Sequence, residues 1–402
     1  MSDAAGHPEQ ASAPLGRGEP RDVGTVEATY DALYIGLMSG TSLDGIDAVL
    51  AHTSTARLQV RGHASIDFDP ELRAELLALN TVGSNELHRA ALASNALARA
   101  CAALVLRLLK GADTPAAHVR AIGVHGQTVR HQPSLHDGTG YTLQLNNPAL
   151  LAELTGIDVV ADFRSRDVAA GGQGAPLVPA FHASLFSQPD IDVAVLNLGG
   201  IANLSLLPAT ERQGTVRGFD CGPANALLDH WCQRHRGQSF DADGAWSASG
   251  TVNDALLARC LHEPYFAQPL PKSTGRDLFN PAWLEARLTQ LPAEPRPVDV
   301  QATLAELTAR SCADALRQHA PGTQSLLVCG GGARNSDLMA RLRRLLPGLR
   351  LESTDAHGLP TQQVEAAAFA WLAHLTLERL PGNLPAVTGA RGLRVLGAIY
   401  PR

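Results

Sequence analysis

Residues 34–52 of the chain have the sequence YIGLMSGTSLDGIDAVLAH, and this stretch sets the expected fold. An apolar strand leads into the glycine-rich turn GTSLDG, and a second apolar strand follows the turn. Residues 58–66, LQVRGHASI, predict a third strand, which completes a meander. Residues 70–110 carry apolar side chains at helical spacing, so we expect helices after the meander.

The same order of elements recurs about 160 residues further along the chain. Residues 193–208, VAVLNLGGIANLSLLP, again predict a strand, a glycine turn and a strand. Residues 215–222 supply a third strand, and residues 224–235 begin a helix. A third glycine turn follows the predicted strand of residues 325–329. The repetition predicts an α/β protein with two similar lobes.

Composition excludes several classes of protein. The chain has 402 residues, of which 45% are apolar and 18% charged, as in ordinary globular proteins. A net charge of −6 gives no basic field for a phosphate backbone, so we expect no nucleic acid partner. The six cysteines form no C-x-x-C pair, which argues against a zinc or disulfide framework.

The beginning of the chain carries no recognisable targeting signal. Residues 1–30 are rich in Ala, Gly, Pro and charge, and we expect them to form a mobile extension without chemistry. They lack the pattern of a secretory signal, and no apolar run reaches the roughly 18 residues of a spanning helix. We therefore expect a cytoplasmic protein with no membrane partner.

The glycine turns are the first candidate functional feature. Each turn leaves backbone N–H groups at a sheet edge, where an anionic phosphate can bind. The first turn has the glycine spacing of a Walker loop, but Ile46 and Asp47 stand where Lys and Ser/Thr are required. A tight hairpin with Gly45 at positive φ is the alternative for this turn alone. The similar turn within residues 197–203 favours phosphate binding at both.

Two carboxylates are candidates for acid–base chemistry. Asp220 ends a predicted strand just before Gly222 and a helix. It can cap that helix, or it can face a cleft between the lobes and act as a general base on water or a sugar hydroxyl. Glu365 lies on a helix among Ala and Phe residues, where a lone carboxylate must be exposed, paired or functional.

The densest polar cluster is Asp162, Arg164, Arg166 and Asp167, which lies between an apolar strand and a glycine-rich loop. Arginine forks are suited to the carboxylate or phosphate of a substrate, which favours an anionic small molecule. A solvated, self-paired edge strand is the alternative.

Two further polar segments follow apolar strands or lie in loops. His125 and Gln127 come directly after a strand and can hydrogen-bond a polar ligand, although a surface histidine is the alternative. The histidines lack H-x-x-x-H spacing, so we expect no zinc site. The basic loop of residues 272–276 is compatible with phosphate contacts and with an ordinary surface loop.

The residues alone leave three functions open: an ATP-dependent sugar kinase, a sugar hydrolase that uses Asp220 and Glu365 without nucleotide, and an ATP-binding scaffold of the actin type. The glycine turns argue against the hydrolase, because a glycosidase needs no phosphate cradle. The scaffold would not need the charged cluster of residues 162–167.

Several stretches together closely resemble the anhydro-N-acetylmuramic acid kinases of bacteria. They are residues 34–50, 123–133, 146–182, 218–225, 240–250, 271–280, 327–335 and 354–360. The resemblance implies the fold of the sugar kinase, actin and heat-shock ATPase superfamily, with a duplicated ribonuclease-H-like core and a cleft between lobes. The first lobe would be residues 31–185 and the second residues 186–402.

The resemblance also implies an activity. Family members use water and ATP to open the 1,6-anhydro ring and phosphorylate O6, which gives N-acetylmuramic acid 6-phosphate and ADP in cell-wall recycling; another sugar kinase of the same fold is the alternative. The implied cofactors are ATP and Mg²⁺, with the metal held mainly by phosphates and waters near Asp44 or Asp47. The metal ligands and the oligomeric state stay open, a homodimer included.

Carried over by position, Asp220 is the expected base that activates water at C1, and Glu365 is a supporting carboxylate. The expected ATP-binding residues are Gly40, Thr41, Ser42, Leu43, Asp44, Gly45, Ile46, Asp47, Asn197, Gly199, Gly200, Asn203, Gly330, Gly331, Gly332 and Asn335. The expected sugar-binding residues are His125, Gln127, Asp162, Arg164, Arg166, Asp167 and Gly222.

Overall fold

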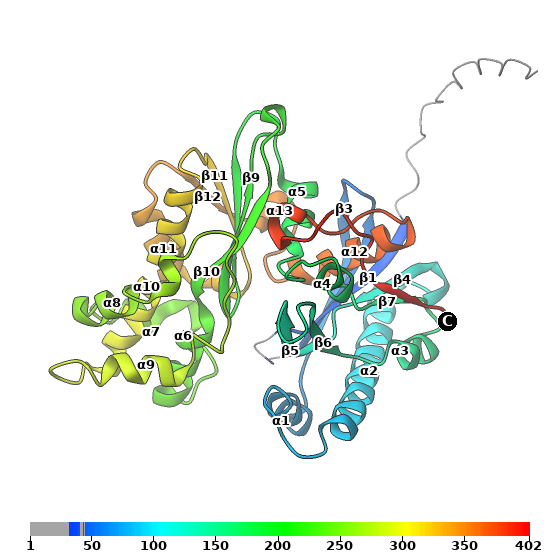
Figure 1. Ribbon diagram of the computed structural model, residues 1–402, viewed down its shortest axis with the longest axis horizontal. Coiled ribbons are helices and arrows are strands. Elements are labelled where there is room, and N and C mark those ends of the chain that lie inside the picture. Colours follow the sequence, from blue (N-terminus) through cyan, green and yellow to red (C-terminus); the bar gives the residue numbers. More distant parts are fainter. Residues whose placement is uncertain (1–31, 41–42, 44) are drawn as a thin grey trace, which may run out of the picture. The chain divides into compact units, whose positions relative to one another are not determined.

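Two sheets with one topology form the centre of the protein (Figure 1). The computed structural model describes residues 32–40, 43 and 45–402. The strands are β1 (Ala32–Met38), β2 (Gly45–Thr53), β3 (Leu58–Asp67), β4 (Val119–Val124), β5 (Gln127–Pro133), β6 (Gly140–Leu145), β7 (Val159–Ala161), β8 (Val193–Leu198), β9 (Ile201–Leu207), β10 (Arg217–Pro223), β11 (Ser325–Cys329), β12 (Arg350–Ser353) and β13 (Ala398–Tyr400).

Apart from β13 at the edge of the first sheet, strand order and direction are the same in both sheets. The first sheet has the order β13-β7-β4-β1-β2-β3, and the second has the order β10-β9-β8-β11-β12. In the first, β1, β2 and β3 form an antiparallel meander, and β1 then pairs in parallel with β4, and β4 with β7. In the second, β8, β9 and β10 form the meander, and β8, β11 and β12 are parallel. This duplicated ribonuclease-H-like topology confirms the predicted fold.

Helices cover the sheets. They are α1 (Pro70–Ala78), α2 (Glu86–Gly111), α3 (Pro148–Thr155), α4 (Ser165–Ala169), α5 (Val178–Phe186), α6 (Asn225–Arg236), α7 (Ala245–Ala248), α8 (Asp254–Leu261), α9 (Pro281–Leu288), α10 (Pro297–His319), α11 (Ser336–Leu345), α12 (Val364–Leu377) and α13 (Pro385–Thr388). Local sequence starts α1, α3 and α9 in one way: an Asp or Asn side chain accepts a backbone N–H, and Pro follows it. The helices predicted for residues 70–110 are confirmed as α1 and α2.

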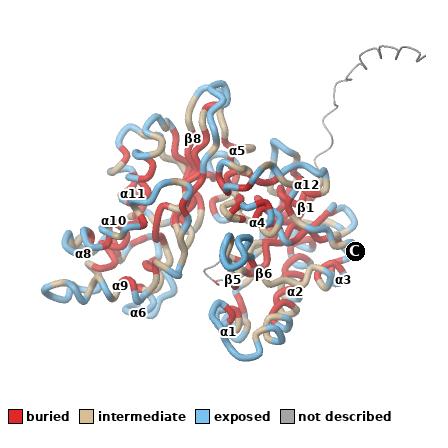
Figure 2. The backbone as a smooth tube through the Cα atoms, viewed as in Figure 1, coloured by how far each residue is buried: buried red, intermediate tan, exposed pale blue. Residues whose placement is uncertain are grey.

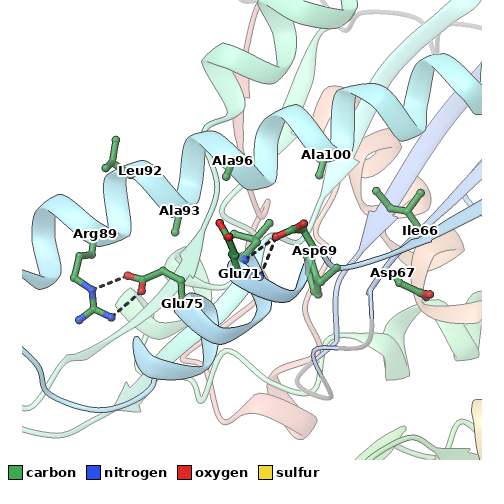
Figure 3. Close-up of a pocket in the computed structure, with 12 residues that line it drawn as sticks. Ile66, Asp67, Asp69, Glu71, Glu75, Arg89, Leu92, Ala93, Ala96 and Ala100 are labelled. Carbon is green, nitrogen blue, oxygen red and sulfur yellow. Dashed lines mark hydrogen bonds and ion pairs between the residues drawn. The ribbon is translucent and has the colours of Figure 1, made fainter. Parts of the chain in front are cut away.

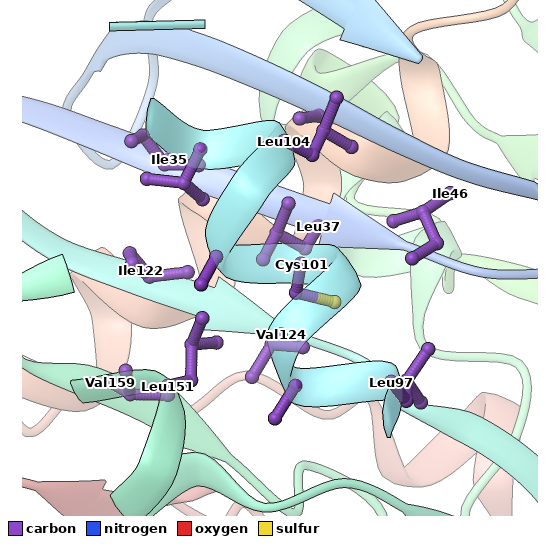
Figure 4. Packing of buried hydrophobic residues seen from close by; sticks show 14 of the residues in the cluster. Ile35, Leu37, Ile46, Leu97, Cys101, Leu104, Ile122, Val124, Leu151 and Val159 are labelled. Carbon is purple, nitrogen blue, oxygen red and sulfur yellow. The ribbon is translucent and has the colours of Figure 1, made fainter. Parts of the chain in front are cut away.

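Side chains along β1 point alternately to the two faces of the first sheet, and each face belongs to a different hydrophobic core. Ile35 and Leu37 pack with α2 on one face, and Figure 4 shows Leu37 beside Cys101 of that helix. Tyr34 belongs to the core on the other face. By length and composition α2 could cross a membrane. One face of it, including Leu97, Leu104 and Leu108, is buried in this core.

α12 packs directly on the first sheet, and its side chains share a core with Val193 and Leu327 of the second sheet. A Cβ on Gly36 would lie 1.8 Å from the carbonyl oxygen of Ala366, and one on Gly123 would lie 2.0 Å from that of Phe369. Since real Cβ atoms never approach so closely, only glycine lets β1 and β4 touch the helix backbone. Figure 2 shows that β8, β1 and α12 are mostly buried.

The end of the chain returns to the first sheet, because β13 pairs with β7. Residues 31–402 form one compact unit, and the lobe boundary after residue 185 stays a proposal. The structure adds that α12 and β13, which follow residue 186, pack with the first sheet. All six cysteines are buried and free of disulfides, as the sequence indicates. The predicted extension of residues 1–30 lies outside the described residues.

Candidate active site

Asp220 lies at a bulge in β10, where the register with β9 shifts between Asp220 and Gly222. The backbone N–H of Thr274 donates to its Oδ2 across 2.9 Å, and the Tyr265 hydroxyl donates to its carbonyl across 2.8 Å. Burial raises the pKa of Asp220 to about 7, although the Thr274 amide and the charge of Arg164 oppose this rise. A carboxyl with a pKa near neutrality is suited to general base catalysis.

Asp220 does not cap the helix that follows it, so the alternative from the sequence is excluded. The N-terminus of α6 has no side-chain cap. Its first backbone N–H groups donate instead to the carbonyls of Gly199 and Gly200, at 3.0–3.1 Å. Gly222, expected at the sugar, is buried with a φ of 148°, and a Cβ there would lie 2.7 Å from the ring of Phe266. In this structure Gly222 is needed for close packing against Phe266.

Three polar residues form a row across the second sheet. Asn203 pairs with Asn197 of β8 on one side and with Asp220 of β10 on the other. Directly paired residues place their side chains on the same face of a sheet. The candidate base and two predicted ATP-binding residues therefore share one face.

Glu365, near the start of α12, meets this row. Asn197 donates from Nδ2 to its Oε1 across 3.5 Å. Burial raises the pKa of Glu365, and the negative charge of Asp47 adds to the rise, while Arg164 opposes it. Because Asp47 lies on β2 and Asn197 on β8, Glu365 connects the first glycine turn with the second sheet.

Arg164 and His125 form the centre of the site on the first sheet. Arg164 donates from Nε to Nε2 of His125 across 3.0 Å, and from one terminal nitrogen to the carbonyl of Gly174 across 2.8 Å. Burial lowers the pKa of Arg164 to about 10, while the charges of Glu365, Asp167 and Asp220 oppose this change. Because an arginine only donates, Nε2 of His125 must be the acceptor, and the ring is neutral with its proton on Nδ1.

The other charged residues of this cluster have different environments. Arg166 is exposed, and Asp162 is exposed and accepts a hydrogen bond from Ser165 across 2.5 Å. Asp167 is fully buried, and both its oxygens accept hydrogen bonds from the protein. The expectation that Asp167 faces the sugar is therefore wrong for this structure, because no carboxylate oxygen is open to a ligand.

The second and third glycine turns meet at Asn197. A Cβ on Gly330 would lie 2.4 Å from its Oδ1, and one on Gly332 would lie 2.6 Å from Cβ of Leu198. Glycine is therefore required where the turns approach each other. Gly331 is exposed, whereas Asn335 caps α11 by accepting the N–H of Leu338 across 2.9 Å. The cap therefore uses Oδ1 of Asn335, a residue expected to bind ATP.

The first glycine turn is described in part. Thr41, Ser42 and Asp44 lie outside the described residues. Leu43 donates its N–H to the carbonyl of Gly40 across 3.2 Å, and the side chains of Leu43 and Ile46 are buried in the core. Any contact of these two residues with a phosphate would thus be made by backbone. Gly45 is needed for close packing, because a Cβ there would lie 2.1 Å from the carbonyl oxygen of Ile66.

Several buried polar atoms of the described residues lack a hydrogen-bond partner, and four of the residues lie around this site. They are Nδ1 of His125, Oε1 of Gln127, both side-chain polar atoms of Asn146, and Oγ1 of Thr274. Buried polar groups are normally paired, so such a group marks a place for a ligand or water. Asn146 was missed from sequence, although it lies within a motif of the resemblance, whereas Thr274 belongs to the basic loop that the sequence made compatible with phosphate contacts.

The basic loop of residues 272–276 is not an ordinary surface loop. Lys272 is buried, and its Nζ donates to the carbonyl of Phe266 across 3.0 Å. Its carbonyl accepts the N–H of Asp220 across 3.3 Å. Lys272 therefore holds the segment that supplies the Thr274 amide to Asp220.

A separate cavity of about 680 Å³ lies beside β3, α1 and α2 (Figure 3). Its lining includes Leu92 and the ion pair of Arg89 with Glu75, and none of the predicted site residues. Beside it, Arg73 of α1 donates from Nε to the carbonyl of Leu43 across 2.9 Å. The cavity contacts the element that supports the first glycine turn rather than the site itself.

The repeated sheet, with glycine turns at the ends of its first strands and carboxylates beside them, gives the duplicated ribonuclease-H-like fold and the phosphate-binding turns that a two-lobed kinase needs. The family model for anhydro-N-acetylmuramic acid kinase matches residues 32–402. The chain belongs to the anhydro-N-acetylmuramic acid kinase family. It is a kinase that acts on this sugar with ATP.

The similar proteins include two bacterial relatives and a solved structure. Anhydro-N-acetylmuramic acid kinase of Variovorax paradoxus is 63% identical over 371 residues, which cover 92% of this chain and 99% of the relative. That of Albidiferax ferrireducens is 61% identical over 386 residues, with the same shares covered. A ROK family glucokinase from Streptomyces griseus, solved with glucose and AMPPNP, covers 84% of this chain and 98% of its own at 13% identity and a TM-score of 0.36.

Proposed function

We propose that Asp220 is the general base that activates water at C1 while the γ-phosphoryl group of ATP is transferred to O6. The main support for this proposal is the row of Asn197, Asn203 and Asp220 on one face of the second sheet. Burial raises the pKa of Asp220 to about 7, and its strand β10 pairs with β9, which the turn expected to bind ATP joins to β8. The same face thus supports both halves of the reaction.

The reaction balances without a separate acid. The water oxygen bonds to C1 as the C1–O6 bond breaks, and O6 takes the phosphoryl group while ADP leaves. The water proton passes to Oδ1 or Oδ2 of Asp220, as to the base of an inverting glycosidase. Since phosphorus captures the departing oxygen, no second carboxyl has to protonate it. A hydrolase without nucleotide would need that acid.

We assign the charged side chains around the base to separate tasks. Arg164 opposes the negative charges of Asp220 and Glu365 and keeps His125 neutral. The exposed guanidinium of Arg166 is free to bind the lactyl carboxylate of the sugar. The unpaired polar atoms of His125 and Gln127 are suited to the sugar's neutral polar groups.

ATP and Mg²⁺ fit the residues present. The glycine turns at residues 40–45, 199–200 and 330–332 would hold the nucleotide. Among the described residues, no three metal-binding side chains come together. Asp47 and Glu365 nevertheless fit Mg²⁺, which is usually held by one or two carboxylates together with phosphate oxygens and water. The bound cation would neutralise charge on the phosphates.

We place this activity in the cytoplasm, where the sugar product enters peptidoglycan recycling, and we keep a homodimer as the oligomeric state to test. The test of the reaction is turnover in water labelled with heavy oxygen. We expect the label on C1 and none in the phosphate group, in product trapped before anomeric exchange. Label in phosphate, or ring opening without ATP, would contradict the proposed reaction.

A further inference from the structure

The chain's C-terminal segment, residues 383–394, packs on the side chain of Asp167. Oδ1 of Asp167 accepts hydrogen bonds from Nδ2 of Asn383 across 2.7 Å and from Oγ1 of Thr388 across 2.8 Å. Its Oδ2 accepts the N–H of Gly174 across 2.8 Å. Asp167, Asn383 and Thr388 are almost wholly buried. A buried carboxylate with several donors is a rigid anchor, because loss of any donor leaves charge unsatisfied.

The anchor continues to the active site through the glycine-rich loop. The N–H of Gly174 donates to Asp167, and the carbonyl of Gly174 accepts a hydrogen bond from the guanidinium of Arg164 across 2.8 Å. A Cβ on Gly172 would lie 2.2 Å from Oδ2 of Asp167, so the loop wraps closely around the carboxylate. The backbone N–H of Gln173 also donates to the carbonyl of Thr388 across 2.7 Å. The segment, the loop and Arg164 form one connected network.

We propose that Asn383 and Thr388 are positioning residues of the active site: they hold Asp167, which fixes the Gly174 loop and thereby keeps the guanidinium of Arg164 where its charge acts on Asp220 and Glu365. This assigns the C-terminal segment a part in catalysis. The proposal rests on Asp220 as the base.

The charges around Asp220 determine how release of Arg164 would change its pKa. Asp220 faces Arg164 from the first sheet, and the Thr274 amide, the Tyr265 phenol and the thiol of Cys221 from its own side. Arg164 also faces Glu365 and Asp167. Of these groups, Arg164 is the cation that stabilises the Asp220 carboxylate. If Arg164 is released, the pKa of Asp220 rises, and the base is protonated over a wider range of pH.

Thr388→Val removes the hydroxyl with little change of shape, and Thr388→Ser keeps it. We expect Thr388→Val to lower kcat/KM near neutral pH by about tenfold and to move the acid limb of its pH profile to higher pH. Thr388→Ser should restore both. Thr155→Val is the matched control, because it also removes a buried hydroxyl hydrogen bond, to the carbonyl of Leu151 at 2.7 Å, and that bond involves none of Asp167, Gly174 and Arg164. It should leave the limb in place.

Two further variants separate the possible failures. Asn383→Ala removes the other side-chain donor to Asp167 and must move the acid limb in the same direction. It therefore tests the positioning proposal if Thr388→Val does not fold. Asp220→Asn must abolish the limb; if the limb persists at wild-type strength, the base assignment is wrong, whatever Thr388 does. If Asp220→Asn abolishes the limb, but Thr388→Val and Asn383→Ala lower only the Tm, the network is merely structural and the positioning proposal is overturned.

Discussion

Nε of Arg164 donates to Nε2 of His125 across 3.0 Å, and this contact fixes the charge state of the histidine. Burial lowers the pKa of His125 well below its usual value, and the charge of Arg164 lowers it further. The ring is therefore a neutral donor through Nδ1, which is buried and has no partner in the described part of the chain. It is suited to hydrogen-bond a ligand but not to move a proton.

The first prediction concerns this histidine. Nitrogen NMR should show His125 as the neutral Nδ1–H tautomer even at about pH 5.5, where an unperturbed histidine is mostly protonated. Arg164→Met removes both the donor and the nearby charge. In that variant we expect protonation of His125 at higher pH than in the wild type. A protonated His125 in the wild type at pH 5.5 would contradict the assignment.

The second prediction concerns the base. Asp220→Asn should lower kcat by roughly 10²–10⁴-fold, because the amide cannot take the proton of water. ATP affinity should change little, since the glycine turns are untouched. Asp314→Asn is the control: this exposed carboxylate pairs, within the described part of the chain, with Arg317 at 3.0 Å, so turnover should stay at the wild-type level. Wild-type turnover in Asp220→Asn would remove Asp220 from the mechanism.

The third prediction concerns stability and pH. The pKa of Asp220 is about 7 in the folded protein, above its ordinary value of 3.8. The native state therefore holds the proton more tightly, and ionisation weakens folding as pH rises from about 4 through 7. Asp220→Asn removes this cost. Its Tm, relative to the wild type, should be higher at about pH 8 than at about pH 4. A Tm difference that does not change with pH would mean that burial does not destabilise the ionised form of Asp220.

The sequence predicted the sheet and the strand-end residues because both depend on local patterns. Alternation and glycine turns defined the two meanders, and the position of Asp220 followed from the end of a strand. The capping alternative for Asp220 could not be excluded from sequence. It depended on the carbonyls of Gly199 and Gly200, which take the N–H groups of α6 only after the sheet has formed.

The partners of buried charges could not be predicted in this way. Asp167 was expected at the sugar from its position in a motif of the resemblance, yet its side-chain donors are 216 and 221 residues further along the chain. Nothing in the local pattern of residues 383–388 marks them as donors to a buried carboxylate. The loop around Lys272 has the composition of a surface loop, but Nζ of Lys272 donates to the backbone carbonyl of Phe266 in the interior. Such contacts follow from tertiary packing.

The fourth prediction tests the close packing that holds Glu365 in place. Gly36→Ala puts a methyl group where the Ala366 carbonyl now lies, 1.8 Å from the new Cβ position. Because backbone is on both sides, β1 and α12 must separate, and we expect a loss of about 1–3 kcal/mol in the free energy of unfolding. Glu365 neighbours Ala366, so kcat should fall as well. Gly111→Ala, in open space at the end of α2, should instead stabilise by about 0.5–1 kcal/mol. Chemical denaturation and turnover of both variants decide this: if Gly36→Ala keeps wild-type stability and kcat, contact between β1 and α12 does not position Glu365.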